Sequence, residues 1–254
     1  MSERPELITI QQIAKTFGGK EDSVVALEPF SLEIAEGELV SIVGPSGCGK
    51  STLLRIIAGL EKPTSGKIVL GTADLKRPVG FVFQDAVLLP WKTVADNIRF
   101  PLDTSGIPRS QGEEKVRELI RLVGLEGFEN SLPKQLSGGM RQRAAIARAL
   151  ADDPPILLMD EPFSAVDLLT RETLNDELSR IWRQTGKTIL LVTHSVEEAA
   201  YLGTKVMVMS PRPGRLKKTI DVGLPLPRDE HTRRSAEYLD LVSDLRNMMR
   251  EMTK

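Results

Sequence analysis

The chain has 254 residues, of which 41% are hydrophobic and 27% are charged, and this balance predicts a globular protein with a substantial core. Its 34 basic and 35 acidic side chains give a formal charge of −1, which argues against a nucleic acid partner. The single cysteine, Cys48, cannot form an internal disulfide. No stretch has the layout of a signal peptide or the length of a bilayer span, so we expect another chain to supply any membrane part.

Short apolar runs alternate with segments of helical period, and this order favours a mostly parallel β-sheet that is covered by helices. Residues 38–43, ELVSIV, are typical of a buried strand, and a glycine-rich loop connects them to the predicted helix KSTLLRIIAGL. A second strand is expected at 78–83, where the run contains VGFVF. These elements predict an α/β fold.

The strand pattern stops between about residues 88 and 150. Apolar residues recur there at helical spacing: Val116, Leu119, Ile120 and Val123. No strand-like run follows before ILLM at 156–159. We therefore expect a helical insert between strands of the sheet.

After the insert, the pattern predicts an amphipathic helix and two further strands. The helix carries Leu174, Leu178 and Ile181 on one face, and the strands are TILLV at 188–192 and KVMVM at 205–209. Beyond residue 235, apolar residues again follow helical spacing: Tyr238, Val242, Leu245, Met249 and Met252. This tail is expected to be a helix that packs on the core.

Residues 44–51, GPSGCGKS, match the G-x-x-x-x-G-K-[ST] pattern of a phosphate-binding loop, and they lie between a predicted strand and a predicted helix. Glycines allow backbone N–H groups to converge on an anion, Lys50 adds a positive charge near the outer phosphates, and Ser51 can ligate Mg²⁺. The thiol of Cys48 either reports nucleotide binding or is a packed bystander. The predicted ATP-binding residues here are Gly44, Pro45, Ser46, Gly47, Cys48, Gly49, Lys50, Ser51 and Thr52.

Polar residues follow three of the predicted strands, at the sheet edge where open α/β folds bind ligands. Asp160 suits Mg²⁺, and Glu161 can orient the attacking water or accept its proton. His194 can donate to the γ-phosphate, and the amide of Gln84 can reach Mg²⁺ or water. Acidic residues can also simply cap a strand, and a lone histidine is more often structural, but the phosphate loop favours the functional interpretation.

Residues 136–143, LSGGMRQR, start a further predicted helix, with Ser137, Gly138 and Gly139 in the arrangement of a phosphate-binding N-terminus. The lysine that such a site normally uses is absent. An ordinary helix cap by Ser137 is the alternative, and it leaves the paired glycines unexplained.

Together these motifs resemble the ATP-binding cassette subunits of ABC transporters, over roughly residues 7–220. The shared motifs are the phosphate loop, Gln84, LSGGMRQR, ILLMDEP, SAVD and His194, in the family's order. The resemblance implies a single ABC ATPase domain over 1–254 with a RecA-like P-loop core and an N-terminal antiparallel β piece at 1–87 and 151–222. It also implies an inserted α-helical subdomain at 88–150 and a C-terminal helical tail at 223–254.

The resemblance further implies Mg²⁺-dependent ATP hydrolysis by two copies packed head to tail, so that LSGG of one copy completes the phosphate site of the other. Ser137, Gly138, Gly139 and Asp167 would then bind ATP across the interface. The metal ligands would be Ser51, Gln84 and Asp160, and the catalytic residues Glu161, His194 and Gln84. Phe17 aligns with the family's adenine-stacking aromatic, with a core phenylalanine as the alternative.

Three segments are similar to importers of nitrate, sulfonates and taurine: FVFQDAVLLPWKTVADNI, DEPFSAVDLLTR and RPGRL. This branch implies two integral-membrane permease subunits, an indirect link to an extracytoplasmic solute-binding protein, and a peripheral location at the cytoplasmic face of the inner or plasma membrane. One alternative is a soluble ABC-type ATPase in assembly or repair. Another is a nucleotide-regulated binding module in which Glu161 is idle.

Overall fold

The computed structural model describes residues 5–19, 22–72 and 75–252. The chain divides into two compact units: the first comprises residues 1–75 and 187–254, and the second comprises residues 76–186. The second unit holds two strands in addition to its helices, so it is larger than the insert expected at 88–150. The domain bounds expected from the sequence therefore stay a prediction.

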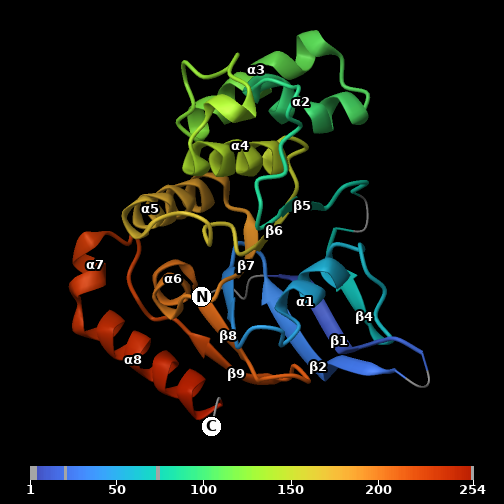
Figure 1. Cartoon of the computed structure of the whole chain (residues 1–254), viewed down its shortest axis with the longest axis vertical. Coiled ribbons are helices and arrows are strands. Elements are labelled where there is room, and N and C mark those ends of the chain that lie inside the picture. Colours follow the sequence, from blue (N-terminus) through green and yellow to red (C-terminus); the bar gives the residue numbers. More distant parts are fainter. Residues whose placement is uncertain (1–4, 20–21, 73–74, 253–254) are drawn as a thin grey trace. The chain divides into compact units, whose positions relative to one another are not determined.

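The first unit opens with an antiparallel sheet of strand order β2-β1-β4 (Figure 1). Its strands are β1 (Glu6–Phe17), β2 (Val24–Ala35) and β4 (Ser65–Leu70). Buried aliphatic side chains cover one side of it, among them Ile8, Ile10, Ile13, Leu27 and Ile34. This sheet is the antiparallel β piece that the resemblance implied.

A second set of strands in the first unit leads to the phosphate loop. β3 (Leu39–Val43) lies between β7 (Thr188–Val192) and β8 (Lys205–Met209) and is parallel to both. β9 (Leu216–Asp221) pairs antiparallel with β8. Every residue of β3 and β7 is buried, which explains their uninterrupted apolar sequences. Because β3 and β7 are parallel neighbours, their carboxyl ends lie at the same edge of the sheet.

The helices of the first unit, in the part of it that the structure describes, are α1 (Lys50–Ile57), α6 (Val196–Leu202), α7 (Glu230–Arg234) and α8 (Ala236–Glu251). α6 packs against β3, and α8 packs against α6. The buried face of α8 contains Tyr238, Val242 and Leu245, which are three of the apolar residues that predicted this helix. The Tyr238 hydroxyl also donates to the carbonyl of Glu197 at 3.2 Å.

Buried Arg228 fastens the segment before α7 to the end of α6. Its guanidinium donates to the carbonyls of Tyr201 at 2.6 Å and Gly203 at 2.8 Å, and the Tyr201 hydroxyl donates back to the Arg228 carbonyl at 3.0 Å. Burial lowers the pKa of Arg228 to about 10, so the side chain stays charged at neutral pH. A cation is favourable here because the carbonyls at a helix C-terminus carry partial negative charge.

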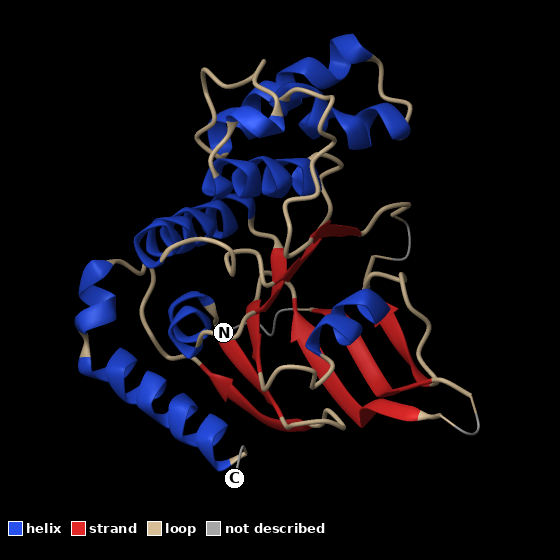
Figure 2. Cartoon of the chain, in the orientation of Figure 1, coloured by secondary structure: helices blue, strands red, loops and turns tan. Residues whose placement is uncertain are grey.

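In the second unit, β5 (Val79–Val82) pairs in parallel with β6 (Ile156–Asp160). Its helices are α2 (Val94–Thr104), α3 (Arg109–Leu122), α4 (Gly138–Leu150) and α5 (Leu168–Thr185), with a short 3₁₀ turn at Pro133–Gln135 (Figure 2). α4 contacts the other three helices and β5. Gly80 permits the close contact with β5, because a Cβ atom there would lie 2.4 Å from the carbonyl oxygen of Ala149.

The predicted fold class is confirmed: the chain is α/β, with an antiparallel sheet near its start and helices between β5 and β6. Among residues 5–19, 22–72 and 75–252, none of the helices combines the length and apolar character needed to cross a bilayer.

Candidate active site

The predicted site residues are divided between the two units. The first unit carries Phe17, the loop 44–52 and His194. The second unit carries Gln84, the segment 137–139, Asp160, Glu161 and Asp167. Within the first unit the loop and His194 share one sheet edge, and within the second unit Gln84, Asp160 and Glu161 share another strand edge.

The phosphate loop leaves the end of β3 and enters α1 through two left-handed glycines, Gly47 at φ 76° and Gly49 at φ 97°. Gly49 is the N-cap of α1, and no side chain caps this helix start. The first N–H groups of a helix lack partners within it, and together with the helix dipole they favour an anion. The loop therefore presents an uncapped helix N-terminus to a phosphate group.

The ammonium group of Lys50 is buried within the loop, with the residue only 6% exposed. It donates to the carbonyls of Gly44 at 2.8 Å and Pro45 at 3.1 Å. These contacts hold a positive charge in place before any anion arrives. A phosphate oxygen bound there would gain a charge-assisted hydrogen bond, which is roughly twice as strong as a neutral one.

The side chain of Cys48 is fully buried, with its Sγ 3.9 Å from the Nζ atom of Lys50. Burial raises the pKa of this thiol, and the nearby ammonium opposes the rise only in part. The thiol is therefore protonated at neutral pH and reacts slowly in the folded loop.

His194 follows Thr193 at the carboxyl end of β7, and its side chain is exposed. The amide of Thr193 donates to the carbonyl of Ile42 in β3 at 3.1 Å, which fastens the end of β7 beside the strand that leads into the phosphate loop. His194 and the loop thus share one sheet edge.

Phe17 ends β1 and is 40% exposed, so it is not a core residue. The Nζ atom of Lys15 lies 4.7 Å from the centroid of its ring. The exposed ring can accept a stacked base, and its contact with adenine stays a prediction.

Asp160 ends the buried strand β6 and is itself 7% exposed. Glu161 then adopts φ 49°, in the left-handed region that non-glycine residues seldom occupy. Ser164 fixes this turn, because its amide and hydroxyl both donate to the Glu161 carbonyl, at 3.2 and 3.0 Å. Strained residues of this kind are concentrated at functional sites.

Gln84 lies two residues beyond β5, whose last residue pairs with Met159 of β6. Because β5 and β6 are parallel, the structure places Gln84 at the same strand edge as Asp160 and Glu161. The buried Gln142 of α4 donates to the carbonyl of Phe83 at 3.4 Å, so the segment before Gln84 is tied to the helix that LSGG begins.

Ser137 is the N-cap of α4, and its hydroxyl accepts a hydrogen bond from the amide of Met140 at 3.2 Å. The helix-cap interpretation therefore explains the serine. A Cβ atom on the buried Gly139 would lie 3.3 Å from Thr170, so packing against α5 favours glycine at this position. Gly138 is exposed and meets nothing closer than Val166 at 3.7 Å, so packing does not explain it.

Asp167 is the N-cap of α5. The contact between Gly139 and Thr170 places the start of α5 beside the start of α4. Hydrogen bonds from Thr170 lower the pKa of the Asp167 carboxyl group. Sequence reasoning missed the next two residues, Leu168 and Leu169, which are 67% and 75% exposed. Their position just after a helix cap, outside the apolar face of α5, is the signal that could have identified them.

The donor set of the predicted site fits ATP with Mg²⁺. The uncapped start of α1 and the buried ammonium of Lys50 suit phosphate, as shown above. The predicted metal ligands offer a hydroxyl, an amide oxygen and a carboxylate, which are the hard donors that Mg²⁺ prefers. Among the described residues no three His, Cys, Asp or Glu side chains converge as a metal cage, and Mg²⁺ in phosphate-transfer sites does not require one.

A family model described as ABC transporter matches residues 27–164. An uncharacterized ABC transporter ATP-binding protein of Methanocaldococcus jannaschii is 47% identical, and the match covers 96% of this chain and 91% of that protein. An aliphatic sulfonates import ATP-binding protein of Bacillus cereus is 42% identical, over 89% of this chain and 90% of its own. A taurine import ATP-binding protein of Burkholderia pseudomallei is 46% identical, over 81% and 80%.

Among solved structures, the chain is similar to a dimeric post-hydrolysis state of the ATP-binding cassette MJ0796 bound to ADP and Pi. The TM-score is 0.73 at 36% identity, and the match covers 85% of this chain and 99% of that chain.

Proposed function

The chain belongs to the ABC transporter family, and on that basis we propose that it is the ATP-hydrolysing subunit of an importer for nitrate, a sulfonate, taurine or a similar small solute. The observation that carries the proposal is the phosphate loop, in which an uncapped helix start lies next to a buried lysine. The names of two relatives, import ATP-binding proteins for aliphatic sulfonates and for taurine, support the import role and the kind of solute.

In the proposed reaction the protein positions ATP and stabilises charge, and it forms no covalent bond with the substrate. The start of α1 and Lys50 bind the phosphates, and Glu161 orients the attacking water and accepts its proton. His194 donates to the γ-phosphate, and Phe17 stacks on adenine. Ser51, Gln84 and Asp160 would hold Mg²⁺, which neutralises charge on the phosphate oxygens.

We also propose that two copies pack head to tail, with Ser137, Gly138, Gly139 and Asp167 of one copy completing the phosphate site of the other. Ser137 and Gly138 are exposed at the start of α4, and the exposed Leu168 and Leu169 follow Asp167. Covering such an exposed apolar pair with another protein surface is energetically favourable. A related cassette whose structure is described as dimeric supports the pairing of two copies.

The permease is proposed to contact the second unit at Trp91, which is 73% exposed. The fully buried side chain of Asn97 in α2 is hydrogen-bonded to the loop that carries Trp91. The amide oxygen of Asn97 accepts from the Leu89 amide at 2.7 Å, and its nitrogen donates to the Lys92 carbonyl at 2.9 Å. An exposed aromatic side chain on a stiff loop is typical of residues that dominate protein interfaces.

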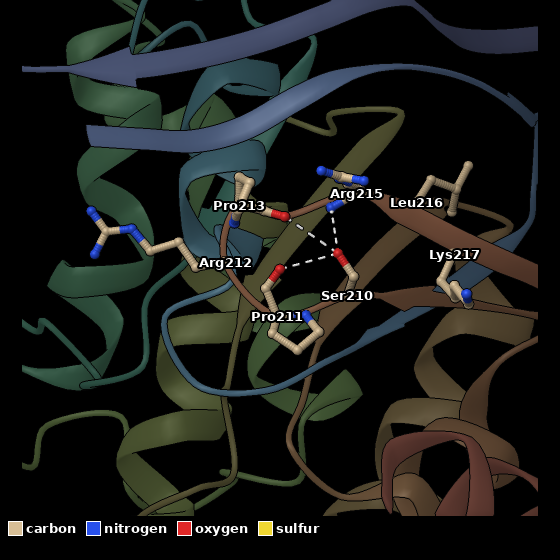
Figure 3. Close-up of a pocket in the computed structure, with 7 residues that line it drawn as sticks. All are labelled: Ser210, Pro211, Arg212, Pro213, Arg215, Leu216 and Lys217. Atoms are coloured by element: carbon tan, nitrogen blue, oxygen red, sulfur yellow. Dashed lines mark hydrogen bonds between the residues drawn. The ribbon is translucent and has the colours of Figure 1, made fainter. Parts of the chain in front are cut away.

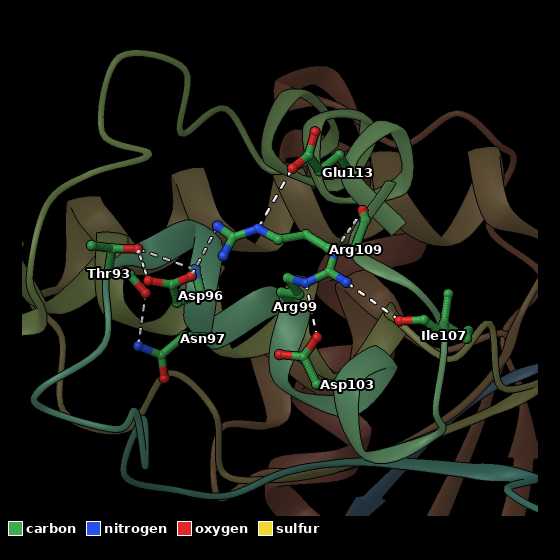
Figure 4. Close-up of polar contacts among 8 residues, drawn as sticks. All are labelled: Thr93, Asp96, Asn97, Arg99, Asp103, Ile107, Arg109 and Glu113. Carbon is green, nitrogen blue, oxygen red and sulfur yellow. Dashed lines mark hydrogen bonds and ion pairs between the residues drawn. The ribbon is translucent and has the colours of Figure 1, made fainter. Parts of the chain in front are cut away.

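Polar contacts also join α2 to the start of α3 (Figure 4). The buried side chain of Arg99 pairs with Asp103 at 2.8 Å, and it donates to the carbonyls of Ile107 at 3.4 Å and Arg109 at 3.0 Å. These bonds join α2 to the start of α3, so a force on the Trp91 loop would be transmitted to the helices. Through the permease, the subunit would sit peripherally at the cytoplasmic face of the membrane and act indirectly on a solute-binding protein.

Purification from native membranes tests this proposal. We expect the wild-type chain to co-purify with a polytopic membrane protein, and Trp91→Glu to reduce that association at least about tenfold, because a buried unpaired carboxylate opposes binding. Leu239→Glu is the matched control, since Leu239 is an exposed apolar residue of α8, 54% exposed, and it should retain the association. Co-purification with only non-membrane assembly factors would contradict the import role, and undiminished association of Trp91→Glu would contradict the contact.

A further inference from the structure

We propose that the turn at residues 210–215, between β8 and β9, is a positioning element that orients a peptide group of the phosphate loop. The residue that makes this possible is Gly214. The inference rests on residues 44–52 being the ATP site, and it adds to that site a part that belongs to none of its motifs.

Hydrogen bonds within the turn connect its two ends (Figure 3). The amide of Ser210 donates to the Arg215 carbonyl at 3.0 Å, and the Arg215 amide donates to the Ser210 hydroxyl at 3.1 Å. The same hydroxyl lies within donating distance of the carbonyls of Pro211 at 3.1 Å and Pro213 at 3.3 Å. Ser210 therefore holds both arms of the turn together.

The turn is also attached to β2. The amide of the buried Gly214 donates to the Ala26 carbonyl at 2.9 Å, and the Glu28 amide donates to the Gly214 carbonyl at 2.9 Å. β2 contacts the phosphate loop directly, because a Cβ atom on Gly49 would lie 2.6 Å from the side chain of Leu27. The backbone of Gly214 is thus fixed between β2 and the phosphate loop, and its hydrogen bonds to β2 oppose a shift away from the loop.

Gly214 directly faces the carbonyl group of Cys48. A Cβ atom on Gly214 would lie 1.9 Å from that oxygen and 3.1 Å from the carbonyl carbon. The two distances differ by nearly the length of a C=O bond, so the carbonyl points almost straight at Gly214. Gly214 is not among the described glycines with positive φ, so the close approach, and not the backbone angle, requires glycine here.

The direction of this carbonyl sets the direction of an N–H group in the site. The Cys48 carbonyl and the Gly49 amide belong to one planar trans peptide, so they point in opposite directions. With the carbonyl aimed at Gly214, the N–H of Gly49, at the start of α1, points away from the turn. A side chain at position 214 would force this peptide to rotate, and the Gly49 N–H would then no longer point in the direction that it has in the structure.

The test compares Gly214→Ala with Gly223→Ala. Gly223 lies in the same unit, and a Cβ atom added there would meet nothing within 4 Å. Two quantities are measured in the folded proteins: the rate at which a maleimide labels Cys48, the only cysteine of the chain, and the KM and kcat for ATP. For Gly214→Ala we expect labelling to accelerate at least about tenfold and KM to rise about 10- to 100-fold, with kcat changed far less, because a hydrogen bond to a charged phosphate is lost from bound substrate and transition state alike. Gly223→Ala should match the wild type in both.

Ser210→Ala is a second variant that adds no atoms and loosens the turn, and it keeps the test decisive if Gly214→Ala fails to fold. It should shift labelling and KM in the same directions by about two- to tenfold. Wild-type KM in a folded Gly214→Ala protein, or in Ser210→Ala if only that variant folds, would overturn the proposal, as would a raised KM with unchanged labelling. A wild-type protein that failed to bind ATP would instead contradict the site assignment, and the labelling rates would still decide whether the turn holds the loop.

Discussion

Glu161→Gln is expected to reduce ATP hydrolysis at least about 100-fold while ATP binding persists, because the amide cannot accept the proton of the attacking water. Glutamine has nearly the same shape as glutamate, and the Ser164 contacts that fix this turn go to the backbone carbonyl of residue 161. The turn should therefore survive the substitution. Phosphate release measures turnover, and equilibrium titration measures binding.

Two further observations make this prediction specific. Size-exclusion chromatography with ATP should show that the variant accumulates as a closed dimer, since hydrolysis is the step that reopens it. Glu118→Gln on the exposed side of α3 is the matched control and should hydrolyse ATP at the wild-type rate. Wild-type turnover in Glu161→Gln would remove Glu161 from the central role and would favour a mechanism without a carboxylate base.

Lys50→Ala is expected to weaken ATP binding about 10- to 100-fold, because a charge-assisted hydrogen bond to phosphate is lost. The substitution also leaves the carbonyls of Gly44 and Pro45 without the ammonium that they now accept from. Calorimetric titration with ATP checks the result. Lys218→Ala removes an exposed lysine from the same unit and should bind ATP like the wild type, whereas an unchanged titration curve for Lys50→Ala would contradict the loop assignment.

Most of the strands that sequence reasoning located are buried on both faces, although the half-buried β5 was also found. β3, β6 and β7 consist entirely of buried residues, so an apolar run was sufficient to locate them. β9 was missed because none of the residues of LKKTID is buried: only Leu216 and Ile220 are half-buried, and its two lysines are exposed. That composition is typical of an edge strand, where the pattern resembles that of a surface loop.

The phosphate loop was predictable because its residues are contiguous and its glycines, lysine and serine occur at fixed spacing. Gly214, Asn97 and the Leu168–Leu169 pair were not, because their importance depends on contacts or exposure that only the folded chain defines. Gly214 lies far along the sequence from Cys48, and nothing near it marks a backbone approach. Likewise, the sequence motif of LSGG did not reveal that packing against α5 favours Gly139 while leaving Gly138 exposed.

The central claim is that each ATP is bound by the phosphate loop of one copy and the LSGG segment of the other. Lys50→Ala and Ser137→Arg should each inactivate the homodimer, the first by removing charge and the second by placing a bulky side chain on the exposed start of α4. Mixing them in equal amounts leaves one intact composite site in every mixed dimer. Because about half of the dimers are then mixed and each has one working site, hydrolysis should recover to roughly a quarter of the wild-type rate. Mixed dimers, isolated through two different affinity tags, that remain as inactive as either parent would contradict the shared site.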